Sequence, residues 1–184
     1  AAGYADLAAK IPAGGEWMIA DFVGSELIQD DAWHILQDYI DDFLANPDAV
    51  AAGDPQAIAD LFEGLTLSGF AMQAARSSRP ASCCDHLFSH FLDMSGHRFN
   101  GKLQSHGFQV AIGTLTMCAA FDELFKLDIS NLDVEACLEA WPSLEQEQER
   151  ALKLFDGTAA PKLGYESITS KYENKEKVRE DLNR

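Results

Sequence analysis

The sequence predicts an all-α domain, and three observations support this fold class. Apolar residues recur at spacings of three and four along most of the chain, which is the period of an amphipathic helix. Clusters of Pro, Gly and Asn separate these segments, as expected at helix ends. No alternating apolar and polar segments flank a tight turn, since the Asn100–Gly101 pair lies in a polar loop. We therefore expect an array of about eight helices.

Two amphipathic helices are expected in the first half of the chain. In segment 31–45, apolar side chains share one face behind acidic residues that suit a helix N-terminus, and Asn46–Pro47 ends the pattern. The next helix begins at Gly53–Asp54–Pro55 and continues to about Arg76.

The second half continues in the same way. Segments 82–94 and 106–126 lack strand alternation and are rich in helix-forming residues, and Pro142–Ser143 precedes a charged helical segment from 144 to 155. The tail 166–184 mixes acidic and basic residues with few apolar ones, which predicts a solvated terminal helix that frays. We find no internal repeat.

The composition is that of one ordinary globular domain over residues 1–184, with 47% hydrophobic and 24% charged residues. A formal charge of −16 and scattered basic residues argue against nucleic acid as a partner. No segment approaches the roughly 20 apolar residues of a membrane span, and none resembles a signal peptide. These features predict a cytoplasmic protein that does not enter a membrane.

Four cysteines occur in the chain, of which Cys83 and Cys84 are adjacent, and no C-x-x-C spacing is present. Adjacent cysteines rarely form a disulfide, so we expect reduced thiols. A role for this pair as small buried side chains is favoured, with a role as extra soft metal ligands as the alternative.

Three of the five histidines lie within a short stretch, as His86, His90 and His106. His86 and His90 are four residues apart and share one face of a helix, as a two-histidine metal site requires, although packing alone explains many such pairs. His106 offers a third nitrogen. Imidazole with a carboxylate suits zinc, iron(II) or nickel. His34 is expected at the rim of a helix and His97 in solvent.

These residues stand in motifs that resemble the sn-glycerol-1-phosphate dehydrogenase family. The motifs are Ala2–Leu7, Lys10–Ile11, Glu16–Trp17, Ser68–Met72, Ser77–Ser82, Asp85–His90, His106–Gly107 and Gly113–Leu115. The resemblance extends from residue 1 to about residue 125. The family belongs with iron-containing alcohol dehydrogenases, glycerol dehydrogenases and dehydroquinate synthases, which have an N-terminal α/β nucleotide-binding domain and a C-terminal helical domain.

The chain resembles only the helical C-terminal domain of that family. A nucleotide-binding domain is therefore expected to precede residue 1, where the chain begins without methionine. The 184-residue chain alone is expected neither to bind NAD(H) tightly nor to turn over. A homo-oligomer is a further possibility for the full-length enzyme.

The resemblance implies that Asp6, His86 and His106 bind one metal, most simply zinc, with nickel or iron(II) as alternatives. It places His90 against the substrate. Spacing alone would have paired His86 with His90, and Asp6 alone would have been interpreted as a surface residue. The family usually has Gly, a small residue and Glu at positions 83–85, and Gly at positions 5 and 76.

Ser77, Ser78 and Arg79 precede Pro80 and offer two hydroxyls and a guanidinium for a substrate phosphate. Equally, this segment can be a helix C-terminal turn whose arginine pairs with an acidic neighbour. Lys10 is compatible with a surface position.

The implied activity is hydride transfer between NAD(H) or NADP(H) and a polyol phosphate, with dihydroxyacetone phosphate as the ketone, as phospholipid metabolism requires. Glycerol dehydrogenase is an alternative. A dehydroquinate synthase-like enzyme is another, although its usual Asn-x-Gly-His-Thr run is absent. A non-catalytic helical domain, with its histidines used for packing, would be distinguished by metal content.

Overall fold

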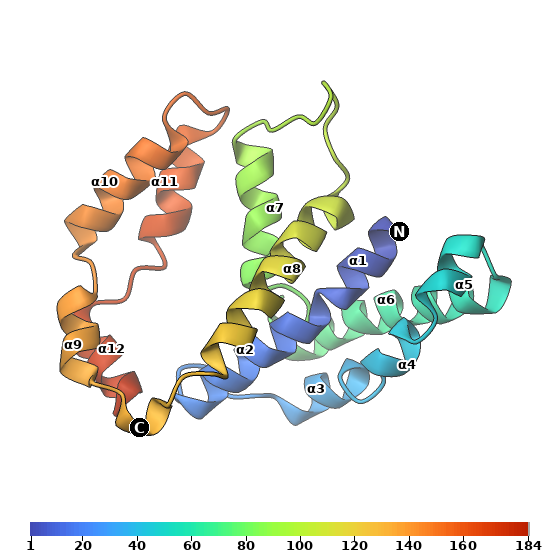
Figure 1. Ribbon diagram of the computed structural model, residues 1–184, viewed down its shortest axis with the longest axis horizontal. Coiled ribbons are helices and arrows are strands. Elements are labelled where there is room, and N and C mark those ends of the chain that lie inside the picture. The colour runs from blue at the N-terminus through green and yellow to red at the C-terminus, as the bar shows by residue number, and fades with distance from the viewer. Residues whose placement is uncertain (184) are drawn as a thin grey trace.

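The computed structural model describes residues 1–183, and this range folds into helices (Figure 1). The predicted all-α fold class is confirmed, because the only β-type pairing within the described range is an isolated bridge between Phe99 and Lys102. That bridge closes a turn in which Asn100 and Gly101 both have left-handed backbone, with φ of 49° and 76°. The polar loop expected there is thus a tight turn without strands.

The helices within residues 1–183 are more numerous and shorter than the periodicity predicts. Their bounds are α1 Ala2–Ala8, α2 Lys10–Phe22, α3 Asp30–Leu36, α4 Ile40–Leu44, α5 Pro47–Ala52, α6 Pro55–Ala75, α7 Cys84–Met94, α8 His106–Leu124, α9 Val134–Ala140, α10 Leu144–Phe155, α11 Pro161–Thr169 and α12 Lys175–Leu182, with a short 3₁₀ helix at Ile129–Asn131. None of these helices is both long and apolar enough to cross a membrane.

Helix ends follow local sequence signals. The Asp54 carboxylate accepts hydrogen bonds from the first backbone N–H groups of α6, and Pro55 occupies the first turn. The same helix ends at Ala75 and is followed by Arg76, which has the left-handed conformation with φ of 52°. This conformation favours glycine, which is the residue the family usually has there. Ser143 and Gln146 form a reciprocal capping box at the start of α10, whose expected bounds are confirmed.

The main apolar core lies between α1, α3, α4, α5 and α6. Its buried members are Leu7, Leu36, Ile40, Val50, Ala57, Leu61 and Ala71. A second cluster forms around Trp17 of α2, whose ring lies 5.9 Å from that of Trp33 and whose indole N–H donates to the Leu27 carbonyl. These clusters fix α1 and α2 against α6.

Segment 31–45 is not the single helix that its periodicity predicts. It divides into α3 and α4, which are separated by a turn at residues 37–39. The Gln37 side chain donates a hydrogen bond to the carbonyl of Lys10, the first residue of α2, 3.0 Å away. This long-range hydrogen bond favours a turn where local periodicity favours continuation.

The tail also differs from the single solvated helix expected over 166–184. Its described part contains the end of α11 and all of α12, and Val178 of α12 is buried. Helix α12 packs against α9, where Arg179 forms an ion pair with Glu135. The tail is held because its few apolar side chains find a partner helix. Arg184 lies outside the described residues.

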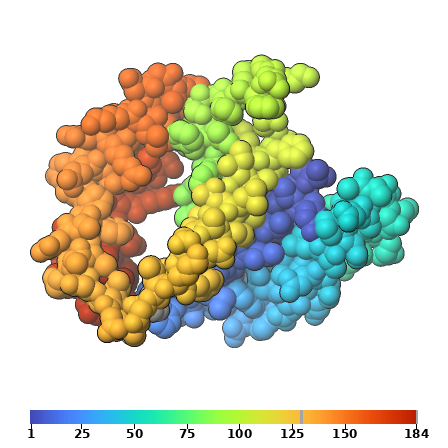
Figure 2. All heavy atoms as spheres, in the orientation of Figure 1, coloured from blue at the N-terminus to red at the C-terminus, as the bar shows by residue number. Residues whose placement is uncertain are grey.

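Helix α8 is the element that brings the histidine segments together, because it packs against both α1 and α7 (Figure 1). Two glycines allow this approach. A Cβ added at Gly107 would lie 2.1 Å from the Ala2 carbonyl oxygen of α1, and one added at Gly113 would lie 2.1 Å from the Asp85 carbonyl oxygen of α7. Helices α9 to α12 form a separate lobe, and Figure 2 shows a hollow between this lobe and α8.

Candidate metal centre

Three side chains from three helices converge at the junction of α1, α7 and α8. Asp6 lies on α1, His86 on α7 and His106 at the first position of α8. The Asp6 Oδ1 atom lies 3.4 Å from His86 Nε2 and 3.6 Å from His106 Nε2. All three donor atoms lie within 4.8 Å of one another. The structure thus brings together the residues that the family resemblance implies as ligands.

The spacing of these atoms fits a shared divalent ion. Ligands at about 2.1 Å from a tetrahedral zinc ion are about 3.4 Å apart, close to the two oxygen–nitrogen distances observed here. Asp6 Oδ1 is buried, yet it has no hydrogen-bond partner among the described residues. A buried acceptor without a partner is costly, and a cation at this point would remove that cost. The donor set therefore fits the metal that the resemblance implies.

The exposure of the three ligands leaves the site open on one side. The side chain of His86 is 9% exposed and that of Asp6 is 24% exposed, whereas that of His106 is 53% exposed. Three protein donors with an open side are typical of catalytic metal sites, in which the remaining positions take water or substrate. A closed structural site would have a fourth protein ligand.

A buried carboxylate orients His86. Asp85 is fully buried, and its Oδ2 lies 2.5 Å from His86 Nδ1, while its Oδ1 accepts the backbone N–H of Cys83. Because an ionised carboxylate only accepts hydrogen bonds, Nδ1 of His86 carries the proton of this contact. The lone pair of the neutral ring is then on Nε2, the atom that faces Asp6. Carboxylate–histidine pairs of this kind commonly support metal ligands.

Lys10 lies next to the site and is buried, with 2% exposure. The interpretation of Lys10 as a surface lysine is therefore wrong. Its ammonium lies 3.4 Å from Asp6 Oδ2, which leaves Oδ1 for the histidines. Burial lowers the pKa of Lys10, although Asp6 acts in the opposite direction. Sequence reasoning missed this burial because lysine is rarely buried without a partner, and the sequence does not show that Asp6 pairs with Lys10.

The pKa values of Asp6 and His86 shift in opposite directions. Burial alone would raise the pKa of Asp6, but the contact with His86 and the charge of Lys10 outweigh it and hold that pKa below its usual range. Burial alone would lower the pKa of His86, but Asp6 and Asp85 hold it above the ordinary value. In the metal-free chain, the site therefore favours a cation next to Asp6, either a proton on His86 or a metal.

His90 lies one turn after His86 on α7 and is exposed. Partial burial lowers its pKa, and the positive charges of His86, Lys171 and His106 lower it further. A histidine with a lowered pKa is neutral near pH 7 and can accept a proton. This position is compatible with the predicted role against the substrate and not with membership of the three-donor cluster.

The predicted phosphate-binding segment shows a different arrangement. The Arg79 guanidinium pairs with Glu26, at 2.6 Å, and also donates to Cys83 Sγ. Ser77 accepts the backbone N–H of Arg79, and Ser78 is exposed. The arginine thus pairs with an acidic neighbour, as the alternative interpretation of this turn expects. Binding of a substrate phosphate by Ser77, Ser78 and Arg79 stays a prediction.

The adjacent cysteines lie outside the donor cluster found in the described part of the chain. Cys83 is buried and Cys84 is half-buried, and both are free thiols. Burial raises the pKa of Cys83 to about 11 and that of Cys84 to about 12, which keeps both protonated. These positions agree with the favoured role in packing.

The remaining histidines are peripheral to this site. His34 is an exposed residue of α3 that contacts Asp38, and His97 is exposed. His97 lines a hollow of about 360 Å³ together with Leu92, Phe99, Gln104, Phe108, Gln109 and Ile112.

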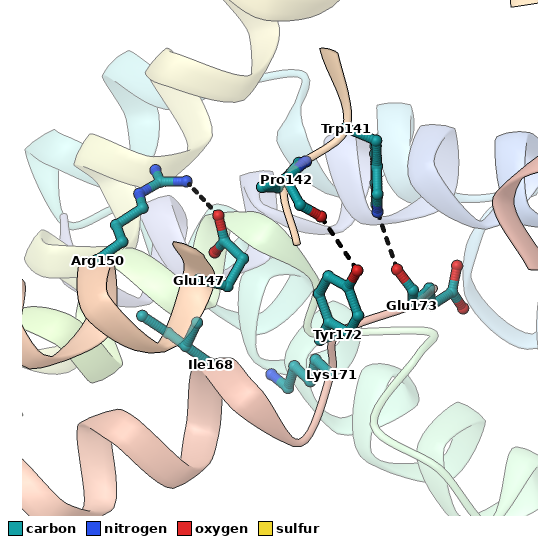
Figure 3. Close-up of a pocket in the computed structure, with 8 residues that line it drawn as sticks. All are labelled: Trp141, Pro142, Glu147, Arg150, Ile168, Lys171, Tyr172 and Glu173. Atoms are coloured by element: carbon teal, nitrogen blue, oxygen red, sulfur yellow. Dashed lines mark hydrogen bonds and ion pairs between the residues drawn. The ribbon is translucent and has the colours of Figure 1, made fainter. Parts of the chain in front are cut away.

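A second hollow, of about 380 Å³, lies in the lobe of α9 to α12 (Figure 3). Its polar groups mostly pair with one another, because Arg150 contacts Glu147, Trp141 donates to the Glu173 carbonyl and Tyr172 donates to the Pro142 carbonyl. Neither hollow contains a member of the three-donor cluster.

Comparison with known proteins supports the same assignment. The chain is 28% identical over 156 residues to the glycerol-1-phosphate dehydrogenase of Halalkalibacterium halodurans, which covers 85% of this chain and 39% of that protein. The chain is similar to glycerol-1-phosphate dehydrogenases. The enzyme of Staphylothermus marinus is 37% identical over 115 residues, with 62% of this chain and 31% of the relative covered. That of Hyperthermus butylicus is 36% identical over 116 residues, with 63% and 32% covered.

The chain spans about a third of the length of these glycerol-1-phosphate dehydrogenases, whose names give NAD(P)⁺ as their cofactor. This coverage is consistent with the helical C-terminal domain that the motifs predict. No protein-family model matches the chain. No solved structure matches it either.

Proposed function

We propose that this chain is the metal-binding catalytic domain of a glycerol-1-phosphate dehydrogenase-like oxidoreductase. The observation that carries the proposal is the convergence of Asp6, His86 and His106. The similarity of the chain to glycerol-1-phosphate dehydrogenases supports it. The proposed reaction interconverts a polyol phosphate and its ketone, dihydroxyacetone phosphate, in the service of phospholipid metabolism.

Asp6, His86 and His106 are the proposed ligands, and zinc is the proposed metal, with nickel and iron(II) as alternatives. When bound, the metal would supply Lewis acidity that stabilises negative charge on the substrate oxygen during hydride transfer to a nicotinamide. The chain itself holds the donors in place. Asp85 orients His86, and Lys10 restrains the second oxygen of Asp6.

His90 is the proposed proton-transfer residue. Its lowered pKa keeps the imidazole neutral near pH 7, so it can take a proton from a substrate hydroxyl in oxidation. The imidazolium formed in this step can return the proton in the reverse reaction. Its exposed position on the same face of α7 as His86 leaves it accessible to substrate.

We further propose that this domain works beside an N-terminal nucleotide-binding domain. Support comes from the relatives, which are about three times as long as the segment they share with this chain. Recognition of NAD(H) or NADP(H) and any homo-oligomer belong to that longer protein, for which a cytoplasmic location stays a prediction. Only small-molecule substrates are proposed as partners at this site.

A metal-binding titration tests the proposal on this chain. Zinc should bind the wild type with one ion per chain, and Asp6→Asn or His86→Ala should remove this site. The matched control is His34→Ala, which removes an imidazole that also contacts an aspartate, but on the exposed face of α3. A wild-type chain that takes up no metal, or a His86→Ala chain that retains the site, would favour a non-catalytic helical domain.

Activity of the protein joined to its nucleotide-binding domain separates the candidate enzymes. A panel of glycerol-1-phosphate, glycerol and a dehydroquinate synthase substrate, each with NAD⁺ and NADP⁺, should give turnover mainly with the phosphorylated polyol. Preference for free glycerol would identify the glycerol dehydrogenase alternative. Turnover of the 184-residue chain alone would contradict the proposed need for a second domain.

A further inference from the structure

A second chain of hydrogen bonds runs from His106 away from the three donors. Ser89 Oγ lies 3.0 Å from His106 Nδ1, and the same hydroxyl lies 2.7 Å from Gln109 Oε1. The Gln109 Nε2 amide then donates to Asp93 Oδ1 over 2.8 Å. We name this chain of Asp93, Gln109, Ser89 and His106 the polar relay.

The interior of the polar relay is closed to water. Ser89 is 0% exposed and Gln109 is 2% exposed, so neither can exchange its partner for solvent. Asp93 and Ser89 both come from α7, four residues apart, whereas Gln109 and His106 come from α8, three residues apart. Close packing of these two helices at Gly113 therefore also sets the geometry of the polar relay.

The direction of each hydrogen bond follows from its first member. An ionised aspartate only accepts hydrogen bonds, so Gln109 must turn its NH₂ group toward Asp93 and its oxygen toward Ser89. The Ser89 hydroxyl has one proton, which it donates to that oxygen. Its lone pairs are then left for His106, so the proton between them must be on Nδ1 of the imidazole.

We infer that Asp93, Gln109 and Ser89 are positioning residues that hold neutral His106 in the tautomer protonated on Nδ1, so that its Nε2 lone pair is ready for a metal. Nε2 is the atom that faces Asp6 Oδ1, at 3.6 Å. The other tautomer would place a proton where the metal must bind.

The tautomers of the two histidines of the site would thus be fixed by different hydrogen-bond partners. His86 is held by direct contact with the fully buried Asp85, whereas His106 is controlled by an exposed carboxylate through two neutral side chains. The difference makes the second arrangement testable, because Asp93 can be changed at the surface without disturbing the buried packing. This inference rests on the proposed metal site.

The sharpest variant is Asp93→Asn, which keeps the size of the side chain but lets it donate as well as accept. Gln109 can then turn its amide over, donate to Ser89 and leave the Ser89 hydroxyl to donate to His106 Nδ1. Long-range proton–nitrogen NMR of the metal-free full chain, at about pH 9 where ordinary imidazole is neutral, identifies the tautomer of each histidine. Wild-type His106 should be protonated on Nδ1, and the variant should show a mixture with the Nε2 form.

Zinc affinity gives a second measure that does not depend on catalysis. Loss of a residue that orients a metal ligand typically weakens metal binding by about 10-fold to 100-fold, and we expect this range for Asp93→Asn and for Ser89→Ala. The matched controls are Asp122→Asn, which removes an exposed negative charge from α8, and Ser95→Ala. Ser95 directly follows α7, and its hydroxyl donates to the Leu92 backbone carbonyl. Both controls should bind zinc as the wild type does.

The outcomes separate the polar relay from the metal site itself. Nε2 protonation of His106 in the wild type would overturn the inference, as would an unchanged tautomer in Asp93→Asn. Weaker zinc binding without a tautomer change would also overturn it, because loss of charge alone then explains the effect. If the wild type binds no zinc, the proposed function fails, while the NMR measurement still decides which tautomer the polar relay selects.

Discussion

Replacing Gly113 with alanine tests the helix contact on which the site depends. Gly113 faces the backbone of α7, and an alanine Cβ there would lie 2.1 Å from the Asp85 carbonyl oxygen, whereas ordinary contact begins at 3.4 Å. Helices α7 and α8 would have to separate by about 1.3 Å. No side-chain rotation can relieve the contact, because the atom that is struck belongs to the backbone.

The expected loss of stability follows from two opposing effects. Alanine is favoured over glycine inside a helix by about 1 kcal/mol. Overpacking costs about 1–3 kcal/mol and occasionally more, and a rigid backbone contact belongs at or above the upper end of that range. We therefore expect Gly113→Ala to lower the free energy of unfolding by about 2 kcal/mol. Zinc affinity should also fall, because Asp85 moves relative to the ligands on α1 and α8.

Denaturation by urea, followed by circular dichroism, measures this change, with Gly69→Ala as the matched control. Gly69 is also inside a helix, but a Cβ there meets no atom within 4 Å. The control should gain up to about 1 kcal/mol from helix propensity alone. The reasoning is refuted if Gly113→Ala is as stable as the wild type or more stable.

Four further predictions concern the site and its surroundings. Arg76→Gly should raise the free energy of unfolding by about 0.5–1 kcal/mol in the same denaturation assay, because Arg76 has a left-handed backbone conformation that glycine adopts without steric cost. A loss of stability would contradict this prediction. Iodoacetamide at about pH 8 should label exposed Cys118 well before Cys84, because burial raises the pKa of Cys84 to about 12. Peptide mass spectrometry measures the two rates, and equal rates would mean that Cys84 is more accessible than in this structure. Without metal, the free energy of unfolding should fall as pH rises through the raised pKa of His86, since protonated His86 stabilises the folded state below that pKa. The zinc-bound chain should instead become more stable over the same range, because protons cease to compete with zinc. Denaturation at a series of pH values with and without zinc should give slopes of opposite sign, and equal slopes would count against the site. His90→Ala should retain zinc binding in a calorimetric titration, because His90 is not in the three-donor cluster. The same substitution should lower turnover of the longer enzyme by about 10²–10⁴-fold, and unchanged turnover would remove His90 from the mechanism.

Sequence patterns predicted the helical class and several helix ends because those features depend on local chemistry. The capping box at Ser143 and the proline after Asp54 act within one turn of helix, so the sequence predicts where these helices begin. The division of segment 31–45 could not be predicted from the sequence. It depends on Gln37 reaching the carbonyl of Lys10, a contact between residues that lie far apart along the chain.

At the site, too, tertiary packing decides what local sequence patterns could not predict. Helical spacing alone favoured His86 with His90, but the convergent pair is His86 with His106, which depends on how α7 packs against α8. Only the family motifs placed Asp6 in this set. The supporting residues Ser89 and Gln109 were missed because a buried polar side chain has no signature in sequence. The one available signal was their helical register, since each follows a ligand histidine by three residues.

Metal-edge X-ray absorption of the zinc-loaded chain tests the central claim most directly. The account predicts two imidazole nitrogens and one carboxylate oxygen at about 2.0–2.2 Å from the ion, with one imidazole lost in His86→Ala and the other in His106→Ala. The His34→Ala spectrum should match that of the wild type. Sulfur in the coordination shell, or a spectrum unchanged by either ligand substitution, would contradict the assignment of Asp6, His86 and His106 as the metal site.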